Sequence, residues 1–193
     1  MKFEAAGFVL AGGLSSRMGR EKAMLELDGE TLLERNLRSL AEVCREVAIA
    51  GGSADLARFG RLIPDERIGE GPLSGIVAAL EASAIAWNLF CPVDVPFVPP
   101  QAWVRLLESA LARAADVVVA RVCGQVQPLC GVYHRRVAPA LRAQLDAGQR
   151  KVTAAIESAG TVFWVDFDQP GAENWFHNLN TPEDYQRLAH PKR

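Results

Sequence analysis

The chain has 193 residues, of which 49% are hydrophobic and 23% charged, as in an ordinary soluble protein with a single core. Its 21 Lys and Arg against 23 Asp and Glu give a net charge of −2, which argues against a general binder of nucleic acid or of anionic membranes. No apolar stretch approaches about 18 residues and no signal peptide is recognisable, so we expect a cytoplasmic protein that does not span a membrane.

Short apolar runs alternate with helical patterns along the first half of the chain. Gly7–Leu10 predicts a buried strand that ends at a glycine pair. Leu32–Val43 carries apolar residues at the spacing of one helix face, which predicts a helix. Val47–Ala50 and Leu62–Ile63 predict two further short strands. A helix is predicted next, over Leu73–Ala84, with a proline at its start.

The second half repeats the alternation. Strands are predicted at Leu89–Pro92, Val117–Arg121, Leu129–Tyr133 and Thr161–Val165, and helices at Gln101–Ala114, Val137–Leu145, Val152–Ser158 and Thr181–Leu188. Strand–helix alternation indicates an α/β fold, with a mostly parallel sheet and helices on both faces in three Rossmann-like layers. No repeat or long linker interrupts the pattern, so residues 1–193 are expected to form a single domain.

In such sheets ligands bind outside the carboxyl ends of the strands, which directs attention to the residues that follow each strand. Gly12 and Gly13 follow the first strand, Asp65 follows the third, and Asp94 follows the fourth. We therefore expect a glycine-rich loop and two carboxylates to converge on one edge.

The glycine-rich loop has the composition of an anion site. Gly12 and Gly13 let backbone amides approach a ligand, Arg17 can grip phosphate oxygens, and Lys22 can act as a point charge. The alternative is a tight turn with surface cations. The loop matches neither G-x-x-x-x-G-K-[ST] nor G-x-G-x-x-G, which disfavours P-loop and dinucleotide-binding proteins.

The two aspartates suit different tasks. Asp94 lies on a proline-stiffened loop, and a carboxylate beside phosphates is a natural ligand of Mg²⁺. The competing interpretation of Asp94 is an aspartate that stabilises a turn or a helix start. Asp65 follows the third predicted strand, separated from it by Pro64. The competing interpretation is an ordinary acidic residue of a loop. Neither the cysteines nor the histidines are spaced as zinc ligands or as partners of a nucleophile.

Three further segments are candidates for substrate contact. Gly71-Pro-Leu-Ser-Gly75 enters a helix, and the backbone of Gly71, Pro72 and Leu73 could lie against a base or a ribose. Asn178 and Asn180 precede a predicted helix start at Thr181 and could orient a hydroxyl or complete a metal's surroundings. Arg150 and Lys151 could form a second anion site. The competing interpretations are that Gly71–Gly75 only starts a helix, that the asparagines are ordinary surface amides, and that Arg150 and Lys151 are a solvated charge pair.

The run Leu10-Ala-Gly-Gly-Leu-Ser-Ser-Arg-Met-Gly19, followed by Lys22, resembles the opening of nucleotidyltransferases with the glycosyltransferase-A-like fold. More narrowly, the chain is similar to molybdenum cofactor guanylyltransferases. Matching pieces follow in order: Pro64-Asp65, Gly71-Pro-Leu-Ser-Gly75, Phe90-Cys-Pro-Val-Asp94, Gln127-Pro-Leu, Arg150-Lys-Val and Asn178-Leu-Asn-Thr-Pro-Glu183. Together they cover nearly the whole chain.

The resemblance implies transfer of GMP from GTP to the phosphate of molybdopterin, with release of pyrophosphate. It implies that Leu10, Ala11, Gly12, Gly13 and Asp65 contact the nucleotide, that Arg17 and Lys22 act on its triphosphate, that Asp94 binds Mg²⁺, and that Arg150 and Lys151 face the phosphate of the pterin. Arg17, Lys22 and Asp94 would then form the catalytic set. Molybdoenzymes or their chaperones are the implied protein partners.

The sequence departs from the pattern of this family at two places, so other functions are also considered. The family often has Arg-Met-Gly-Gly-x-Asp-Lys, but this chain has the shorter Arg17-Met-Gly-Arg-Glu-Lys22, a spacing similar to that of molybdopterin cytidylyltransferases. A family asparagine after the second strand is replaced by glycine around Gly51 and Gly52. A cytidylyltransferase, a nucleotidyltransferase for a sugar or alcohol phosphate, and a non-enzymatic delivery protein for the cofactor are the competing interpretations.

Overall fold

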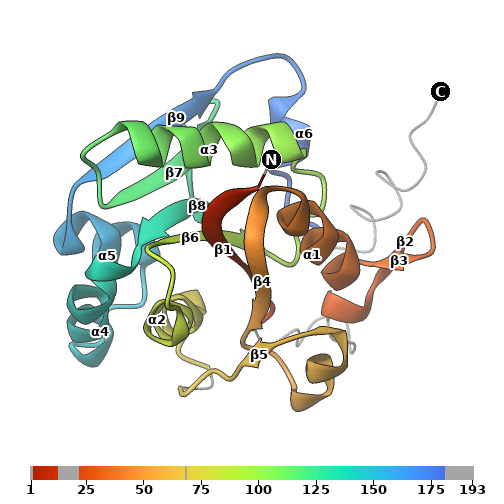
Figure 1. The fold of residues 1–193 in the computed structure, drawn as a ribbon, viewed down its shortest axis with the longest axis horizontal. Helices are drawn as coiled ribbons and strands as arrows, with labels where there is room; N and C mark the ends of the chain where they lie inside the picture. The colour runs from red at the N-terminus through yellow and green to blue at the C-terminus, as the bar shows by residue number, and fades with distance from the viewer. Residues whose placement is uncertain (1, 13–21, 68, 181–193) are drawn as a thin grey trace.

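The central layer of the protein is a seven-stranded sheet with the strand order β5-β4-β1-β6-β8-β7-β9 (Figure 1). A computed structural model describes residues 2–12, 22–67 and 69–180. The strands are β1 (Phe3–Leu10), β4 (Cys44–Ala50), β5 (Leu62–Ile63), β6 (Trp87–Pro92), β7 (Val117–Val122), β8 (Gln125–His134) and β9 (Val162–Phe167). All of them run parallel except β8, which pairs antiparallel with both of its neighbours.

Helices cover both faces of this sheet (Figure 1). On one face lie α1 (Leu32–Val43) and α3 (Pro100–Ala112), and on the other lie α2 (Pro72–Ala82), α4 (Ala138–Asp146) and α5 (Val152–Ala159). The three-layer α/β fold that the sequence predicts is therefore confirmed. In the described parts of the chain, no helix combines the length and the apolar composition that crossing a bilayer requires.

Local sequence explains where the helices begin. Thr31 caps α1 through a capping box with Glu34, in which the hydroxyl accepts from the Glu34 N–H and the carboxylate accepts from the Thr31 N–H. Pro72 opens α2 directly after Gly71, whose φ of +85° favours glycine. The predicted bounds of α1 and β5 agree with the structure. The helix predicted over Thr181–Leu188 lies outside the described residues.

Two hairpins were not anticipated by the pattern of apolar runs. The turn Cys123-Gly124 has φ values of +46° and +76°, and it sends β8 back alongside β7. The turn Asp28-Gly29, with φ values of +55° and +80°, joins β2 (Glu26–Leu27) to β3 (Glu30–Thr31). The remaining elements are α6 (Ala172–Trp175) and the 3₁₀ turns η1 (Lys22–Met24), η2 (Ala54–Phe59) and η3 (Arg135–Val137).

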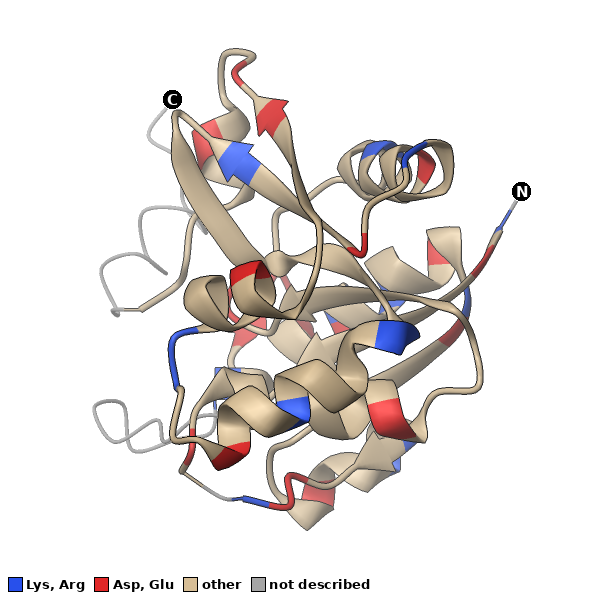
Figure 2. Cartoon of the chain, turned by 90° about the vertical axis from the view of Figure 1, so that its left-hand side faces the viewer, with Lys and Arg blue, Asp and Glu red and all other residues tan. Residues whose placement is uncertain are grey.

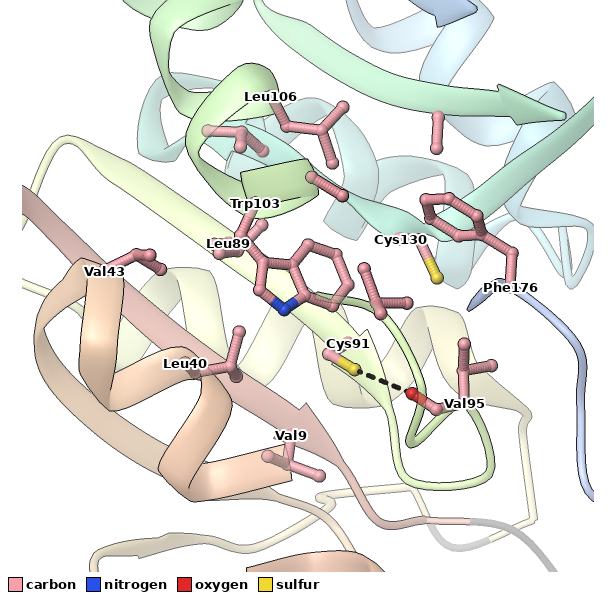
Figure 3. Close-up of a cluster of buried hydrophobic side chains, with 14 of the residues drawn as sticks. Val9, Leu40, Val43, Leu89, Cys91, Val95, Trp103, Leu106, Cys130 and Phe176 are labelled. Carbon is pink, nitrogen blue, oxygen red and sulfur yellow. Dashed lines mark hydrogen bonds between the residues drawn. The ribbon is translucent and has the colours of Figure 1, made fainter. Parts of the chain in front are cut away.

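The larger core lies between the sheet and the α1–α3 layer, and it extends beneath the loop after β6 (Figure 3). Trp103 of α3 is 1% exposed and packs near Phe176, with its indole N–H donating to Ser39 Oγ at 3.1 Å. The Cys91 thiol donates to the carbonyl of Val95 at 3.7 Å. The loop that carries Asp94 is therefore packed against the larger core through its buried residues Val93 and Val95.

Candidate functional site

The carboxyl ends of four neighbouring strands are joined by backbone hydrogen bonds. The Ala11 N–H donates to Ala50 at 2.9 Å, and the Val93 N–H donates to Leu10 at 3.0 Å. The Gly51 N–H donates to Ile63 at 2.9 Å. Gly12, Asp65 and Asp94 follow these strand ends, so the predicted convergence on one edge is confirmed. Gly13 and Arg17 lie outside the described residues.

Close backbone packing requires a glycine beside Gly12. Gly51 has a φ of +76°, and a Cβ at this position would lie 3.0 Å from Gly12 Cα and 3.1 Å from Gly12 N. This contact explains why a glycine stands at position 51. A Cβ added to Gly12 would lie 3.7 Å from Asp65 Oδ2, so that carboxylate stands directly beside the glycine.

The Asp65 carboxylate is held by two donors. Its Oδ1 accepts a short hydrogen bond from the Ser74 hydroxyl and another from the Arg67 N–H at 3.1 Å. Ser74 is 2% exposed on the first turn of α2, so its hydroxyl is fixed by packing. The sequence did not single out Ser74 for this role. The available signal was a hydroxyl inside the otherwise apolar start of a buried helix.

Lys22 connects two segments that are distant in the sequence. Its ammonium donates to Asp94 Oδ2 at 3.0 Å and to Asn180 Oδ1 at 2.8 Å. The Lys22 and Asp94 side chains are only 25% and 19% exposed, respectively. Together Lys22, Asp94 and Asn180 form a polar group, called the Lys22 cluster below, which joins three of the residues that the sequence analysis selected.

Backbone contacts fix Asp94 within this cluster. The buried Asn36 of α1 donates its amide to the Val93 carbonyl at 3.0 Å. The Leu179 N–H donates to the Asp94 carbonyl at 2.8 Å, and the Val95 N–H donates to Pro92 at 3.1 Å. Sequence analysis missed Asn36, although an amide between Leu33 and Leu40 on the apolar face of a helix is an unusual residue that needs a partner.

The described residues contain no group of three or more His, Cys, Asp and Glu side chains placed to hold a metal. Mg²⁺ usually takes one or two carboxylates together with substrate phosphates. Asp94 is the carboxylate of this edge whose chemistry fits such an ion, and in this structure its Oδ2 accepts from Lys22.

Several predicted contact residues can offer only their backbone. The side chains of Leu10, Ala11 and Leu73 are at most 7% exposed and belong to the two cores. Gly71 and Pro72 form the exposed beginning of α2, where Pro72 has no N–H and the Ser74 N–H donates to the Gly71 carbonyl at 3.3 Å. Contact with a ligand through these residues therefore depends on peptide groups.

Arg150 and Lys151 lie at the start of α5, where ion pairs fasten the α4–α5 segment to the β5–α2 connection. Arg150 pairs with Glu70 at 3.0 Å and donates to the carbonyl of Leu145 at 3.0 Å. Arg67 of this connection pairs with Asp146, and Arg142 pairs both with Glu66 of the connection and with Glu81 of α2. Basic and acidic segments intermingle on this side of the molecule (Figure 2).

A hollow of about 430 Å³ lies beside the Lys22 cluster. Its polar lining comes from two parts of the chain, the β7–β8 hairpin and the segment that contains and follows α6: Cys123, Gln125 and Gln127, and Glu173, His177, Asn178 and Asn180. The hollow lies at the start of β8, where Gln125 and Gln127 are found. Because β8 runs antiparallel to β6, the start of β8 lies toward the same edge of the sheet as the carboxyl end of β6. The two predicted asparagines are thus brought together here, and Asn180 belongs to both the hollow and the Lys22 cluster.

Comparison with known proteins gives the site a context. The family model described as "MobA-like NTP transferase domain" matches residues 7–172. A "Probable molybdenum cofactor guanylyltransferase" of Bacillus cereus (strain AH820) is 32% identical over 187 residues, which is 93% of each chain. A protein of the same description from Bacillus cytotoxicus is 29% identical over 195 residues, or 97% of this chain and 98% of the relative.

Solved structures share the fold. Molybdopterin-guanine dinucleotide biosynthesis protein A from Archaeoglobus fulgidus has a TM-score of 0.79 at 24% identity, covering 95% of this chain and 96% of the other. 2-C-methyl-D-erythritol 4-phosphate cytidylyltransferase from Thermus thermophilus has a TM-score of 0.68 at 19% identity, covering 98% and 97%. At these identities the likeness shows the fold alone, which is shared by proteins with different substrates.

Proposed function

Because the chain belongs to the family of MobA-like NTP transferase domains, we propose that it is a molybdenum cofactor guanylyltransferase. It would transfer GMP from GTP to the terminal phosphate of molybdopterin and release pyrophosphate. Curated relatives with this description match almost the full chain. The observation that carries the proposal is the Lys22 cluster, since it pairs a cation with a carboxylate at the edge of the sheet where β1 and β6 end.

The nucleotide would occupy the half of the edge formed by β1, β4 and β5. Peptide groups of Leu10, Ala11 and Gly12 can approach it closely because no Cβ intervenes at Gly12. The Asp65 carboxylate, fixed by Ser74, would accept hydrogen bonds from the guanine or the ribose. Arg17 and Lys22 would act on the triphosphate, where preorganised cations stabilise negative charge.

The reaction requires little proton transfer. An oxygen of the molybdopterin phosphate would form a bond to the α-phosphorus of GTP, while the bond from that phosphorus to the β-phosphate oxygen breaks. Pyrophosphate leaves with the electron pair. Because the attacking oxygen is already anionic, the protein must mainly reduce repulsion between two anions and align them. Lys22 is suited to both tasks from its position between Asp94 and Asn180.

Asp94 would hold Mg²⁺ together with substrate phosphate oxygens. When bound, the ion neutralises charge on the phosphates that react. We place the reaction in the cytoplasm, because all four cysteines are free thiols and a reducing compartment preserves them. Molybdoenzymes or their chaperones would receive the product.

The test is nucleotide selectivity in a pyrophosphate-release assay with purified protein and molybdopterin. GTP should support turnover and form the guanylylated pterin, whereas CTP should support much less. Turnover with CTP in preference to GTP would assign the chain to the cytidylyl branch. Binding of both substrates without release of pyrophosphate would instead identify a delivery protein.

A further inference from the structure

The loop between β6 and α3 carries Asp94, and it is poor in hydrogen-bond donors of its own. Its sequence includes Pro96 and Pro99, and α3 begins at Pro100; a proline has no backbone N–H. The buried carbonyls of this loop therefore need donors from other parts of the chain. The segments that supply these donors are the ones that hold Asp94 in place.

Helix α1 supplies two of the donors. The Asn36 amide donates to the Val93 carbonyl at 3.0 Å, and the Ser39 hydroxyl donates to the Val98 carbonyl at 3.4 Å. The two residues are three positions apart, so they lie on the same side of the helix. They hold the loop on both sides of Asp94.

The Asn36 side chain is itself held in one orientation. Its nitrogen faces the loop, and its Oδ1 lies 3.6 Å from the Cys91 sulfur as an acceptor. The same thiol donates to the Val95 carbonyl at 3.7 Å (Figure 3). Asn36 thus forms part of a buried polar group that connects α1, the end of β6 and the loop.

The first turn of α1 holds the partner of Asp94. The Leu32 N–H donates to the Leu25 carbonyl at 2.8 Å, and the Leu25 N–H donates to the Lys22 carbonyl at 3.1 Å. Asn36 follows Leu32 by four residues, which is about one helical turn. One rigid helix therefore fixes the backbone on both sides of the contact between Lys22 Nζ and Asp94 Oδ2.

Asn36 occupies a position where an apolar residue would be expected. It is 2% exposed, and its neighbours on the buried side of α1, Leu33 and Leu40, are 0% exposed. Burying an amide is costly unless the group is hydrogen-bonded, and a leucine at this position would extend the core. The contact with the Val93 carbonyl is what the amide provides and a leucine cannot.

We propose that Asn36 is a positioning residue, which sets where Asp94 lies relative to Lys22 by holding the Val93 carbonyl. The consequence for catalysis rests on the proposed function, in which Asp94 holds Mg²⁺. Without the amide, the Val93 carbonyl would be left buried and without this donor, a state that favours movement of the loop toward water. The Asp94 carboxylate would move with it.

Hydrogen exchange tests the positioning without any turnover. The N–H groups of Val93 and Val95 are hydrogen-bonded at the start of the loop, so their exchange reports on its opening. In Asn36→Leu both should exchange about 3- to 10-fold faster, which corresponds to one net hydrogen bond. The Ala11 amide, hydrogen-bonded at the neighbouring strand end, should keep its wild-type rate. An equal acceleration at all three amides would overturn the proposal, because it would report a loss of stability alone.

Asn88→Leu is the matched control. Asn88 is 0% exposed, and its amide donates to three backbone carbonyls at 3.2 to 3.4 Å. It lies on β6 toward the end of the strand that is remote from Asp94. This variant removes the same group from an equally buried place, so it should leave the exchange of the loop relative to Ala11 as in the wild type.

Metal dependence tests the consequence for the reaction. Asn36→Leu should raise the Mg²⁺ concentration for half-maximal GMP transfer by about 3- to 10-fold, and excess Mg²⁺ should restore most of the rate. The Mn²⁺ dissociation constant of the GTP-bound protein, measured by electron paramagnetic resonance, should rise by a similar factor. Loss of stability alone would lower the rate at every Mg²⁺ concentration. In an enzyme that transfers GMP, wild-type values of both constants in Asn36→Leu would overturn the proposal.

The two tests separate failure of this inference from failure of the proposed function. If the wild-type protein forms no guanylylated product but Asn36→Leu accelerates exchange in the loop alone, the function is wrong and the positioning role stands. If the wild-type protein transfers GMP and Asn36→Leu changes neither exchange nor metal dependence, the function stands and the positioning role is wrong. Asn36→Ala, which favours the helix, replaces the leucine variant if that variant does not fold, and the same results are expected from it.

Discussion

A single ammonium group serves two acceptors in this site, because Lys22 contacts both Asp94 and Asn180. Without this contact the Asp94 carboxylate would present a bare negative charge where, under the proposed function, phosphates bind. Lys22 offsets that charge in the ligand-free protein. In the proposed reaction the same ammonium would be shared between this carboxylate and the phosphates of the substrate.

Asp94→Asn should lower the rate of GMP transfer by about 10²–10³-fold, because the amide keeps the shape but removes the charge that holds a divalent cation. The loop is fixed through the backbone of Val93, Asp94 and Val95, so the fold should persist. The measurements are pyrophosphate release against Mg²⁺ concentration and circular dichroism.

Asp55→Asn is the matched control, since Asp55 is an exposed acid on η2 and should leave turnover unchanged. Wild-type activity in the Asp94→Asn protein, at the same Mg²⁺ dependence, would remove Asp94 from the mechanism.

Ser74→Ala should raise the KM for GTP by about 10-fold with little change in kcat. The hydroxyl holds Asp65, and a hydrogen bond to a charged group is worth about 1.5–3 kcal/mol. A positioning residue of this kind affects binding more than the chemical step. Ser158→Ala, on the exposed side of α5, is the control. A fall in kcat at constant KM would contradict the assigned role.

The course of β8 depends on one crowded glycine. The register between β7 and β8 shifts between Val119 and Ala120, and the Tyr133 hydroxyl donates to the Pro128 carbonyl across the irregularity. Gly131 lies opposite Val119, and a Cβ there would come within 2.7 Å of the Val118 carbonyl oxygen. The backbones can approach this closely only because the position lacks a side chain.

Gly131→Ala should therefore lower the free energy of unfolding by about 1–3 kcal/mol, the usual cost of overpacking. The same substitution at Gly75 should be neutral or stabilising by up to about 1 kcal/mol, because its Cβ would make only ordinary contacts inside α2. Urea unfolding of the two variants measures both values. Equal effects would show that the close contact at Gly131 relaxes without strain.

The sequence predicted the helices and parallel strands well, because their signal is local. Apolar periodicity placed α1, and apolar runs placed β1, β6 and β7 with ends that differ by a few residues. The hairpin turn at Cys123-Gly124 was missed, since a cysteine with a φ of +46° is not a typical turn residue. The hairpin at Asp28-Gly29 was also missed, although the dipeptide Asp-Gly is a common hairpin turn and could have indicated it.

The part of the candidate site that lies at the strand ends could be predicted from the sequence. Gly12, Asp65 and Asp94 follow parallel strands and had to meet at one edge. Ser74 and Asn36 could not be assigned in the same way, because their roles depend on which helix packs over which loop. The hollow likewise depends on a hairpin that the pattern did not reveal.

Charged groups also join the strands at the far edge of the sheet. Asp116, directly before β7, accepts from the Thr161 N–H at 2.8 Å and pairs with Arg136. Gly160 leaves room for this carboxylate, since a Cβ there would lie 2.7 Å from Asp116 Oδ2. The Thr161 N–H, followed by Arg136, lowers the pKa of the Asp116 carboxyl below its ordinary value.

This shift predicts how stability depends on pH. A carboxyl with a lowered pKa in the folded state stabilises the protein above its unfolded pKa of about 3.9, and the contribution is lost as the pH falls through the folded value. Asp116→Asn should thus reduce the free energy of unfolding by about 1–3 kcal/mol at pH 7. The difference from wild type should shrink below about pH 4.

Denaturant unfolding from pH 3 to pH 7 measures the effect, with Asp55→Asn as the exposed comparison. A difference that stays constant over the whole range would mean that the Asp116 carboxylate charge makes no contribution to stability.

The tight turn between β7 and β8 has one further consequence. Parallel strands must be connected by long crossovers that are built into the core, but this turn projects from the sheet with only two residues, Cys123 and Gly124. Replacing this turn with that of another member of the family should therefore leave the pairing of the other strands intact, which denaturant unfolding would measure.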